Sequence, residues 1–335
     1  MLTMFANMGA YGATLIRWAL VPVFLLLIAA LLYGMLRLIG WRPKPAFGLA
    51  LVSPWLVGFL VFMAFPLLYS LYLSFTDFSI FSGGRWVGLQ NYARLFFHDR
   101  EFWPSLRLTV LYALVTVPIG VVGALLVALL LSQRVKAIGL FRTIYYLPAV
   151  LPEVAVALLW RWLFNSESGL INRLLAPLFR ILRIDQPDWF GDPHYVLPAF
   201  IIMSLWGIFG TNVVIFLAAL TDVPRSLYEA AEIDGAVGWQ KLIYITIPQI
   251  SPIILLQVVM GMISALQIFT VAMFVRPTSA AGKFMNQLVY ERGFVQLHMG
   301  EASAIAWVLF LLILILTLII FRSSPAWVYY EGRER

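Results

Sequence analysis

The chain has 335 residues, of which 62% are hydrophobic and only 12% are charged. A soluble domain has roughly 45–50% apolar and about 25% charged residues, so the composition excludes a soluble protein and indicates an integral membrane protein. The sequence contains no cysteine, which excludes disulfides and thiolate metal sites.

The formal net charge at pH 7 is +7. In a soluble protein this balance would point to nucleic acid, but here the basic residues gather at the ends of apolar stretches, where they bias membrane topology. We therefore predict a lipid membrane as the surroundings and no nucleic-acid partner. The three histidines are scattered and no His-Glu-x-x-His helix occurs, so no metal site is predicted.

Seven stretches are apolar over the roughly 20 residues that a helix needs to cross the hydrocarbon core. They lie at about residues 18–36, 47–73, 108–131, 143–164, 195–220, 250–275 and 302–321. The first is too long for the apolar part of a signal peptide and shows no small-residue cleavage site. We predict an all-α polytopic membrane protein with about seven transmembrane helices.

Two short connections predict the orientation. The linker at 37–45 and the loop at 132–142 each contain three basic residues and no acidic residue. Short cytoplasmic loops are enriched in lysine and arginine, so both connections are predicted in the cytoplasm. Seven spans then put the loop at 221–249 and the C-terminus in the cytoplasm and the N-terminus outside. One observation argues against this orientation: the segment at 165–194, which it puts outside, contains three arginines. Three aspartates in the same segment balance their charge.

That outer segment contains an amphipathic stretch at 170–184, which fits a helix lying along the membrane interface. Before it, Arg161 stands between Trp160 and Trp162, a combination typical of an interfacial anchor.

Glu153 lies inside the predicted span at 143–164, after Pro148 and Pro152. A lone carboxylate at membrane depth is typical of a proton or cation relay. The competing interpretation, which we favour, is that the two prolines unwind the chain and leave Glu153 at the start of a helix beside water.

Polar residues cluster on the fifth and sixth spans, where they are costly unless they face a wet cavity or the bundle interior. Such groups, with the aromatic rings of Trp206 and Phe269, could bind the hydroxyls and C–H faces of a sugar. For each residue alone, a hydrogen bond between helices is an equally ordinary role. The predicted substrate path comprises Ser204, Gly207, Thr211, Asn212, Gln257, Ser264, Gln267 and Thr270.

The charged loop at 221–249 predicts two short helices. Asp222 could cap the first, with Pro224 in its first turn, and Gly235 fits a left-handed helix end. A second helix is expected at 237–247. Two adjacent alanines in the first helix would let a partner surface approach closely. The alternative is an ordinary capped surface helix between two spans, which has the same local pattern.

The loop contains a spaced pattern carried by Glu229, Ala230, Ala231, Asp234, Gly235, Ile245 and Pro248. This pattern resembles the EAA signature of binding-protein-dependent ABC importer permeases, with Ile247 in place of the usual leucine. The segments 87–92, 141–148 and 160–165 are similar to the carbohydrate branch, the maltose and glycerol-3-phosphate permeases. The resemblance runs from about residue 47 to 321 and departs from the branch at 275–280.

The resemblance implies a six-helix permease core at 46–335 and an extra N-terminal helix with its linker at 1–45. It implies that the signature residues couple this chain to an ATPase. It also implies a second permease, an ATPase dimer that holds ATP and Mg²⁺, an external solute-binding protein and a sugar or polyol substrate. No cofactor is expected on this chain, and the location would be a bacterial or archaeal inner membrane.

Two other classes remain as alternatives. An ion-coupled secondary transporter would need a functional intramembrane charge, for which Glu153 is the candidate. An integral membrane enzyme would need a nucleophile, a base or metal ligands gathered in one loop, and the sequence shows no such arrangement.

Overall fold

The computed structural model describes residues 2–133, 138–275, 277 and 282–329. Within these ranges the chain is helical, with only isolated β-bridges between loop residues. It divides into two compact units, Met1–Tyr72 and Leu73–Arg335. The segment at 275–280, where the sequence departs from the carbohydrate branch, lies largely outside the described residues.

The first unit is built from two long helical stretches. Helix α1 (Leu2–Leu38) packs on α2 (Pro43–Phe59), with the rings of Tyr33 and Phe47 6.2 Å apart. Pro43 begins α2 because its missing N–H would be unpaired in the first turn of any helix. A π-helical turn, η1 (Leu60–Ala64), joins α2 to α3 (Phe65–Ser74) without ending the helix.

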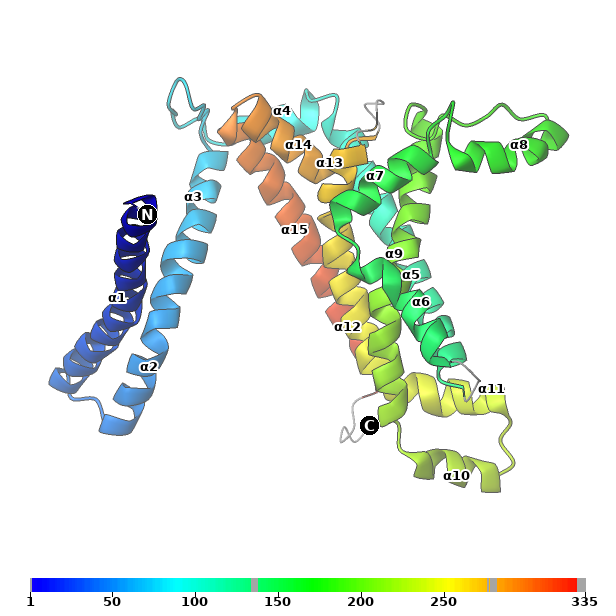
Figure 1. Ribbon diagram of the computed structural model, residues 1–335, viewed down its shortest axis with the longest axis horizontal. Helices are drawn as coiled ribbons and strands as arrows, with labels where there is room; N and C mark the ends of the chain where they lie inside the picture. The colour runs from blue at the N-terminus through cyan, green and yellow to red at the C-terminus, as the bar shows by residue number, and fades with distance from the viewer. Residues whose placement is uncertain (1, 134–137, 276, 278–281, 330–335) are drawn as a thin grey trace. The chain divides into compact units, whose positions relative to one another are not determined.

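The second unit contains the remaining helices (Figure 1). They are α4 (Gln90–Phe97), α5 (Phe102–Leu131), α6 (Ile138–Val150), α7 (Glu153–Leu163), α8 (Leu170–Leu182), α9 (Pro193–Asp222), α10 (Arg225–Ile233), α11 (Gly238–Lys241), η2 (Leu242–Thr246), α12 (Ile247–Leu266), α13 (Thr270–Val275), α14 (Met285–Tyr290), η4 (Glu291–Val295), α15 (Met299–Ser323) and η5 (Ser324–Ala326).

Helix α5 forms the centre of this unit, where it packs against α9 and α12. Its fully buried Ala113, Ala124 and Ala128 lie in the main core cluster. Small side chains let membrane helices approach closely. Dispersion contacts between the helices then stabilise the bundle, because the hydrophobic effect does not favour helix association within lipid.

Four helical stretches among the described residues are long and apolar enough to cross a membrane, and two bent pairs bring the total to six. The described apolar part of α1, Pro22–Leu38, is shorter. The predicted all-α polytopic class is therefore confirmed, whereas the predicted count of seven is not.

The span predicted at 143–164 is two helices, α6 and α7, whose axes meet at 95°. Pro152 precedes α7, and Glu153 is its first residue. The expected unwinding is found at Leu151 and Pro152, whereas Pro148 lies inside α6. The two tryptophans of the predicted interfacial anchor have different surroundings. Trp162 is exposed, whereas Trp160 stacks on Phe164 with ring centroids 5.2 Å apart.

An ion-pair cluster ties the start of α5 to α14 and η4. The Nζ of Lys283 lies 2.7 Å from a Glu101 oxygen and 2.8 Å from a Glu291 oxygen, and Arg292 contacts Asp99 and Glu101. Burial by itself lowers the pKa of Lys283, but the hydrogen bonds and charges of the two glutamates outweigh it and raise that pKa. Lys283 therefore stays charged throughout the physiological pH range.

Gly300, in the first turn of α15, allows a close backbone approach. Its N–H donates to the Phe78 carbonyl at 3.1 Å, and a Cβ at this position would overlap the Thr76 carbonyl oxygen.

We expect Gly300→Ala to destabilise the protein by about 1–3 kcal/mol through overpacking, measured as a lower thermal unfolding midpoint in detergent. Gly34→Ala is the matched control, because a Cβ there meets nothing; equal midpoints for both variants would contradict the expectation.

Candidate functional site: a membrane cavity and a charged loop

A cavity of about 980 Å³ lies within the second unit, among α5, α7, α9, α12 and the breaks that interrupt these spans. Its volume falls in the range of about 300–1,000 Å³ that is typical of small-molecule sites. The breaks before α7 and α13 contribute irregular backbone to the wall. Such backbone is tolerated at membrane depth where it lines a cavity.

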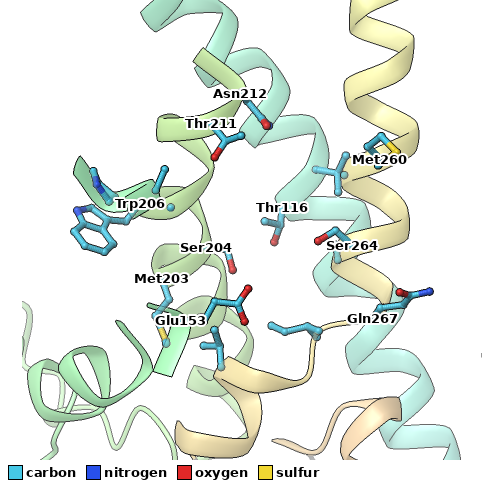
Figure 2. Close-up of a pocket in the computed structure, with 18 of the residues that line it drawn as sticks. Thr116, Glu153, Met203, Ser204, Trp206, Thr211, Asn212, Met260, Ser264 and Gln267 are labelled. Atoms are coloured by element: carbon cyan, nitrogen blue, oxygen red, sulfur yellow. The ribbon is translucent and has the colours of Figure 1, made fainter. Parts of the chain in front are cut away.

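All the residues predicted from the sequence for a substrate path line this cavity: Ser204, Gly207, Thr211, Asn212, Gln257, Ser264, Gln267 and Thr270. Figure 2 shows several of them directed into the same space from α9 and α12. Trp206 and Phe269 lie in the same wall. The structure therefore brings the predicted set together, and contact with a substrate stays a prediction.

Sequence reasoning missed the contribution of α5. Tyr112 and Thr116 line the cavity from this helix, and the Tyr112 hydroxyl shares a hydrogen bond with the Ser204 hydroxyl. The two residues are four positions apart, so they lie on one helix face. This spacing of polar side chains in the third predicted span was the available signal.

Two buried polar atoms in the cavity wall have no hydrogen-bond partner among the described residues: the Thr116 hydroxyl oxygen and the Gln257 amide nitrogen. Thr116 is fully buried and Gln257 is 5% exposed. An unsatisfied buried polar group costs about 1–3 kcal/mol, so a hydroxyl-bearing molecule that reaches these atoms would recover this energy.

Glu153 brings a carboxylate to the cavity, and Figure 2 shows it directed inward near Ser204. None of the lining residues in the described part of the chain is lysine, arginine or histidine. An ionised carboxylate accepts short, charge-assisted hydrogen bonds from hydroxyl groups. The cavity can therefore receive an uncharged polyhydroxylated molecule between acceptors, amides and aromatic rings.

The charged loop projects at the far end of α9 from α8 (Figure 1). Glu229, Ala230, Asp234 and Gly235 are exposed there, and Ala231 is half-buried. Gly235 has φ +75°, which confirms the left-handed helix end expected from the sequence. Of the remaining signature residues, Ile245 packs against the main core cluster, and Pro248 is half-buried in the first turn of α12.

Two local predictions for this loop were wrong. Asp222 does not cap the next helix, because α9 continues through it and Pro224 itself occupies the N-cap of α10. A helix is present from Gly238 as expected, but its predicted end at 247 was wrong, because α11, η2 and α12 form one continuous helical stretch. Pro248 does not end this helical stretch; it lies just after the wide π-helical turn η2, which interrupts the regular α-helical hydrogen-bond ladder there.

Side-chain contacts join α10 to α11 and η2, which lead directly into α12. The hydroxyls of Tyr228 and Thr246 are hydrogen-bonded at 2.8 Å. Lys241 donates to Glu232, also at 2.8 Å. Since α12 also lines the cavity, a push on α10 would be transmitted along a continuous helical element to the cavity wall.

These features define a class: a polytopic transport protein with a polar membrane cavity and an exposed helix pair at one end. Residues 111–326 match the family described as "Binding-protein-dependent transport system inner membrane component". The chain belongs to this family and is an ABC importer permease, a transport subunit rather than an enzyme. The resemblance noted in the sequence is confirmed, and nothing supports the ion-coupled alternative.

The chain is similar to curated permeases over most of its length. It is 39% identical to the probable ABC transporter permease protein YesP of Bacillus subtilis, covering 86% of this chain and 93% of that one. It is 33% identical to the lactose transport system permease protein LacF of Rhizobium radiobacter, covering 86% and 94%. The Thermococcus litoralis trehalose/maltose permease protein MalF is 30% identical, covering 81% and 91%.

A solved structure shares the fold. A bacterial ABC transporter involved in the import of the acidic polysaccharide alginate superposes with a TM-score of 0.72 at 23% identity, covering 83% of this chain and 94% of that one. At this identity the likeness supports the arrangement of helices and nothing about the substrate.

Proposed function

We propose that this chain forms half of the membrane pathway of a sugar or polyol importer. The observation that carries the proposal is the composition of the cavity wall. Hydroxyl, amide and carboxylate groups lie beside aromatic rings there, and the described wall contains no basic residue. The relatives named for lactose and for trehalose and maltose support the same substrate class.

The exposed face of α10 is the proposed contact with a separate ATPase, which would hold ATP and Mg²⁺. Glu229, Asp234 and Gly235 lie on the surface and could meet a partner, while the Tyr228–Thr246 hydrogen bond joins α10 to η2, which leads into α12. Closure of an ATPase dimer would then move α12 against α5 and change the cavity. A second permease chain and an external solute-binding protein complete the proposed transporter.

The proposed orientation puts α10 and the C-terminus in the cytoplasm of a bacterial or archaeal cell and the N-terminus outside. Residues 1–45 would be a helix and linker added to the permease core at 46–335. The basic residues at 37–45 and 132–142 support this orientation.

Affinity purification of the tagged chain in mild detergent tests the assembly. We expect an ATPase and a second permease to accompany it, and the ATPase to be lost from the double variant Glu229→Ala, Gly235→Val. Glu167→Ala, an exposed acidic change between α7 and α8, is the matched control. A folded chain that purifies alone would contradict the proposal.

Thr116→Val is expected to separate stability from transport. Valine removes a buried hydroxyl that has no partner, so the thermal midpoint should stay equal or rise, because an unsatisfied group costs about 1–3 kcal/mol. Uptake by the assembled transporter should fall if this hydroxyl contacts the substrate. Thr109→Val is the control for a hydroxyl in use, since Thr109 accepts from the Met285 N–H, and it should lower the midpoint. Unchanged uptake by Thr116→Val would remove Thr116 from the pathway.

A further inference from the structure

Helix α8 displays an apolar stripe on the side of the molecule away from α10. The stripe consists of Leu170, Leu174, Leu178, Ile181 and Leu182, all exposed, with Leu174 68% and Ile181 78% accessible. Their spacing of three and four residues puts them on one face of the helix. Figure 1 shows α8 lying across the direction of α5 and α9.

The orientation of α8 is fixed by a buried asparagine on its other face. The Asn172 amide donates to the carbonyls of Pro187 and Ser166 at 3.0 and 3.1 Å, and Trp189 donates its ring N–H to the Asn172 side-chain oxygen at 2.7 Å. Trp189 in turn packs on Phe164 with ring centroids 4.8 Å apart. The apolar stripe is therefore held outward by a satisfied network.

A basic stripe borders the apolar one. Arg173 and Arg180 are seven residues apart on α8 and exposed, and α8 contains no acidic residue. Neither Arg173 nor Arg180 forms an ion pair within the described residues, with Asp185 beyond the end of α8 or with any other acid. Asp188 and Asp192 accept instead from the N–H groups of Gly191 and His194. The two arginines therefore remain available to an external anion.

The end of α7 indicates the depth of α8 in the membrane. Arg161 and Trp162 are exposed in the last turn of α7, one short loop before α8 begins. Tryptophan with a basic residue is enriched at the boundary between hydrocarbon and water. Helix α8 therefore begins at the level of the lipid headgroups.

We propose that α8 is an interfacial helix whose leucine stripe enters the acyl region and whose arginines bind anionic phospholipid headgroups. The combination of an exposed apolar face and a basic border is the signature of helices that lie in the interface plane. Guanidinium groups match phosphate oxygens with paired hydrogen bonds. A water-soluble partner protein would leave the leucine stripe against a polar surface.

Because the chain has no cysteine, single-cysteine labelling can measure the depth directly. The full chain carrying Leu178→Cys with a bimane label is reconstituted into vesicles of zwitterionic lipid with or without phosphatidylglycerol. Lipids brominated on their acyl chains should quench this label strongly and a label at Asp185→Cys weakly. A label at position 178 that acyl bromines do not quench would overturn the proposal, whether water or a second protein covers the stripe.

The arginines are tested by their effect on lipid preference. Arg173→Gln with Arg180→Gln should reduce the phosphatidylglycerol that stays bound to the purified chain by roughly twenty-fivefold, at roughly fivefold for each basic residue. Arg100→Gln, an exposed arginine between α4 and α5, is the matched control and should change little. Equal retention by the wild type and the double variant would overturn the headgroup contact.

Discussion

Replacing Gly235 by valine is expected to lower uptake by the assembled transporter roughly 5- to 30-fold while the chain still folds and inserts. Gly235 ends α10 with φ +75°, and a Cβ there would meet no neighbouring atom. The damage therefore comes from backbone strain and not from a clash. A left-handed conformation costs a residue with a side chain about 1–2 kcal/mol, and most for a β-branched one.

To relieve this strain, the backbone after α10 would leave the left-handed conformation, and the orientation of α10 relative to α11 would change. A penalty of about 1–2 kcal/mol lowers the population of the coupled arrangement roughly 5- to 30-fold. Substrate-stimulated ATP hydrolysis should fall together with uptake, because both require the same contact. Gly235→Asn is the matched control, since asparagine tolerates this conformation. Normal substrate-stimulated hydrolysis in the valine variant would refute the coupling role.

The sequence predicted the apolar spans well because lipid imposes a minimum length on any helix that crosses it. It could not settle their continuity. The break between α6 and α7 falls at Leu151 and Pro152, and the 95° turn depends on how α7 packs, which no local pattern encodes. The count of seven stays unconfirmed for another reason, since the described apolar part of α1, Pro22–Leu38, is shorter than a full span.

The candidate site was predicted in part. Polar residues on the fifth and sixth spans stood out because such groups are costly in lipid, and the structure gathers them around one cavity. Tyr112 and Thr116 were missed, because a tyrosine or threonine in an apolar helix reads as an ordinary packing residue until its neighbours are known. The hydrogen bond between Tyr112 and Ser204 joins residues 92 positions apart, a relation that only the fold supplies.

Replacing Gly207 by tryptophan is expected to block the pathway itself. Gly207 lines the cavity, and a Cβ there meets no atom, so an indole would extend into the open space and not into the helix bundle. An indole forced against a bound sugar costs about 1–3 kcal/mol, and about 1.4 kcal/mol corresponds to a tenfold change in rate. Uptake should therefore fall by about tenfold or more, measured with the reconstituted transporter.

Two controls make this result specific. Gly207→Ala should leave uptake unchanged, because a methyl group fits the open space. Gly58→Trp adds the same indole to α2, where a Cβ also meets nothing, and it should transport normally. The tryptophan at 207 should also leave the ATPase bound and its hydrolysis responsive, unlike Gly235→Val. Normal uptake by Gly207→Trp would show that the substrate does not pass through this cavity, whatever the coupling loop does.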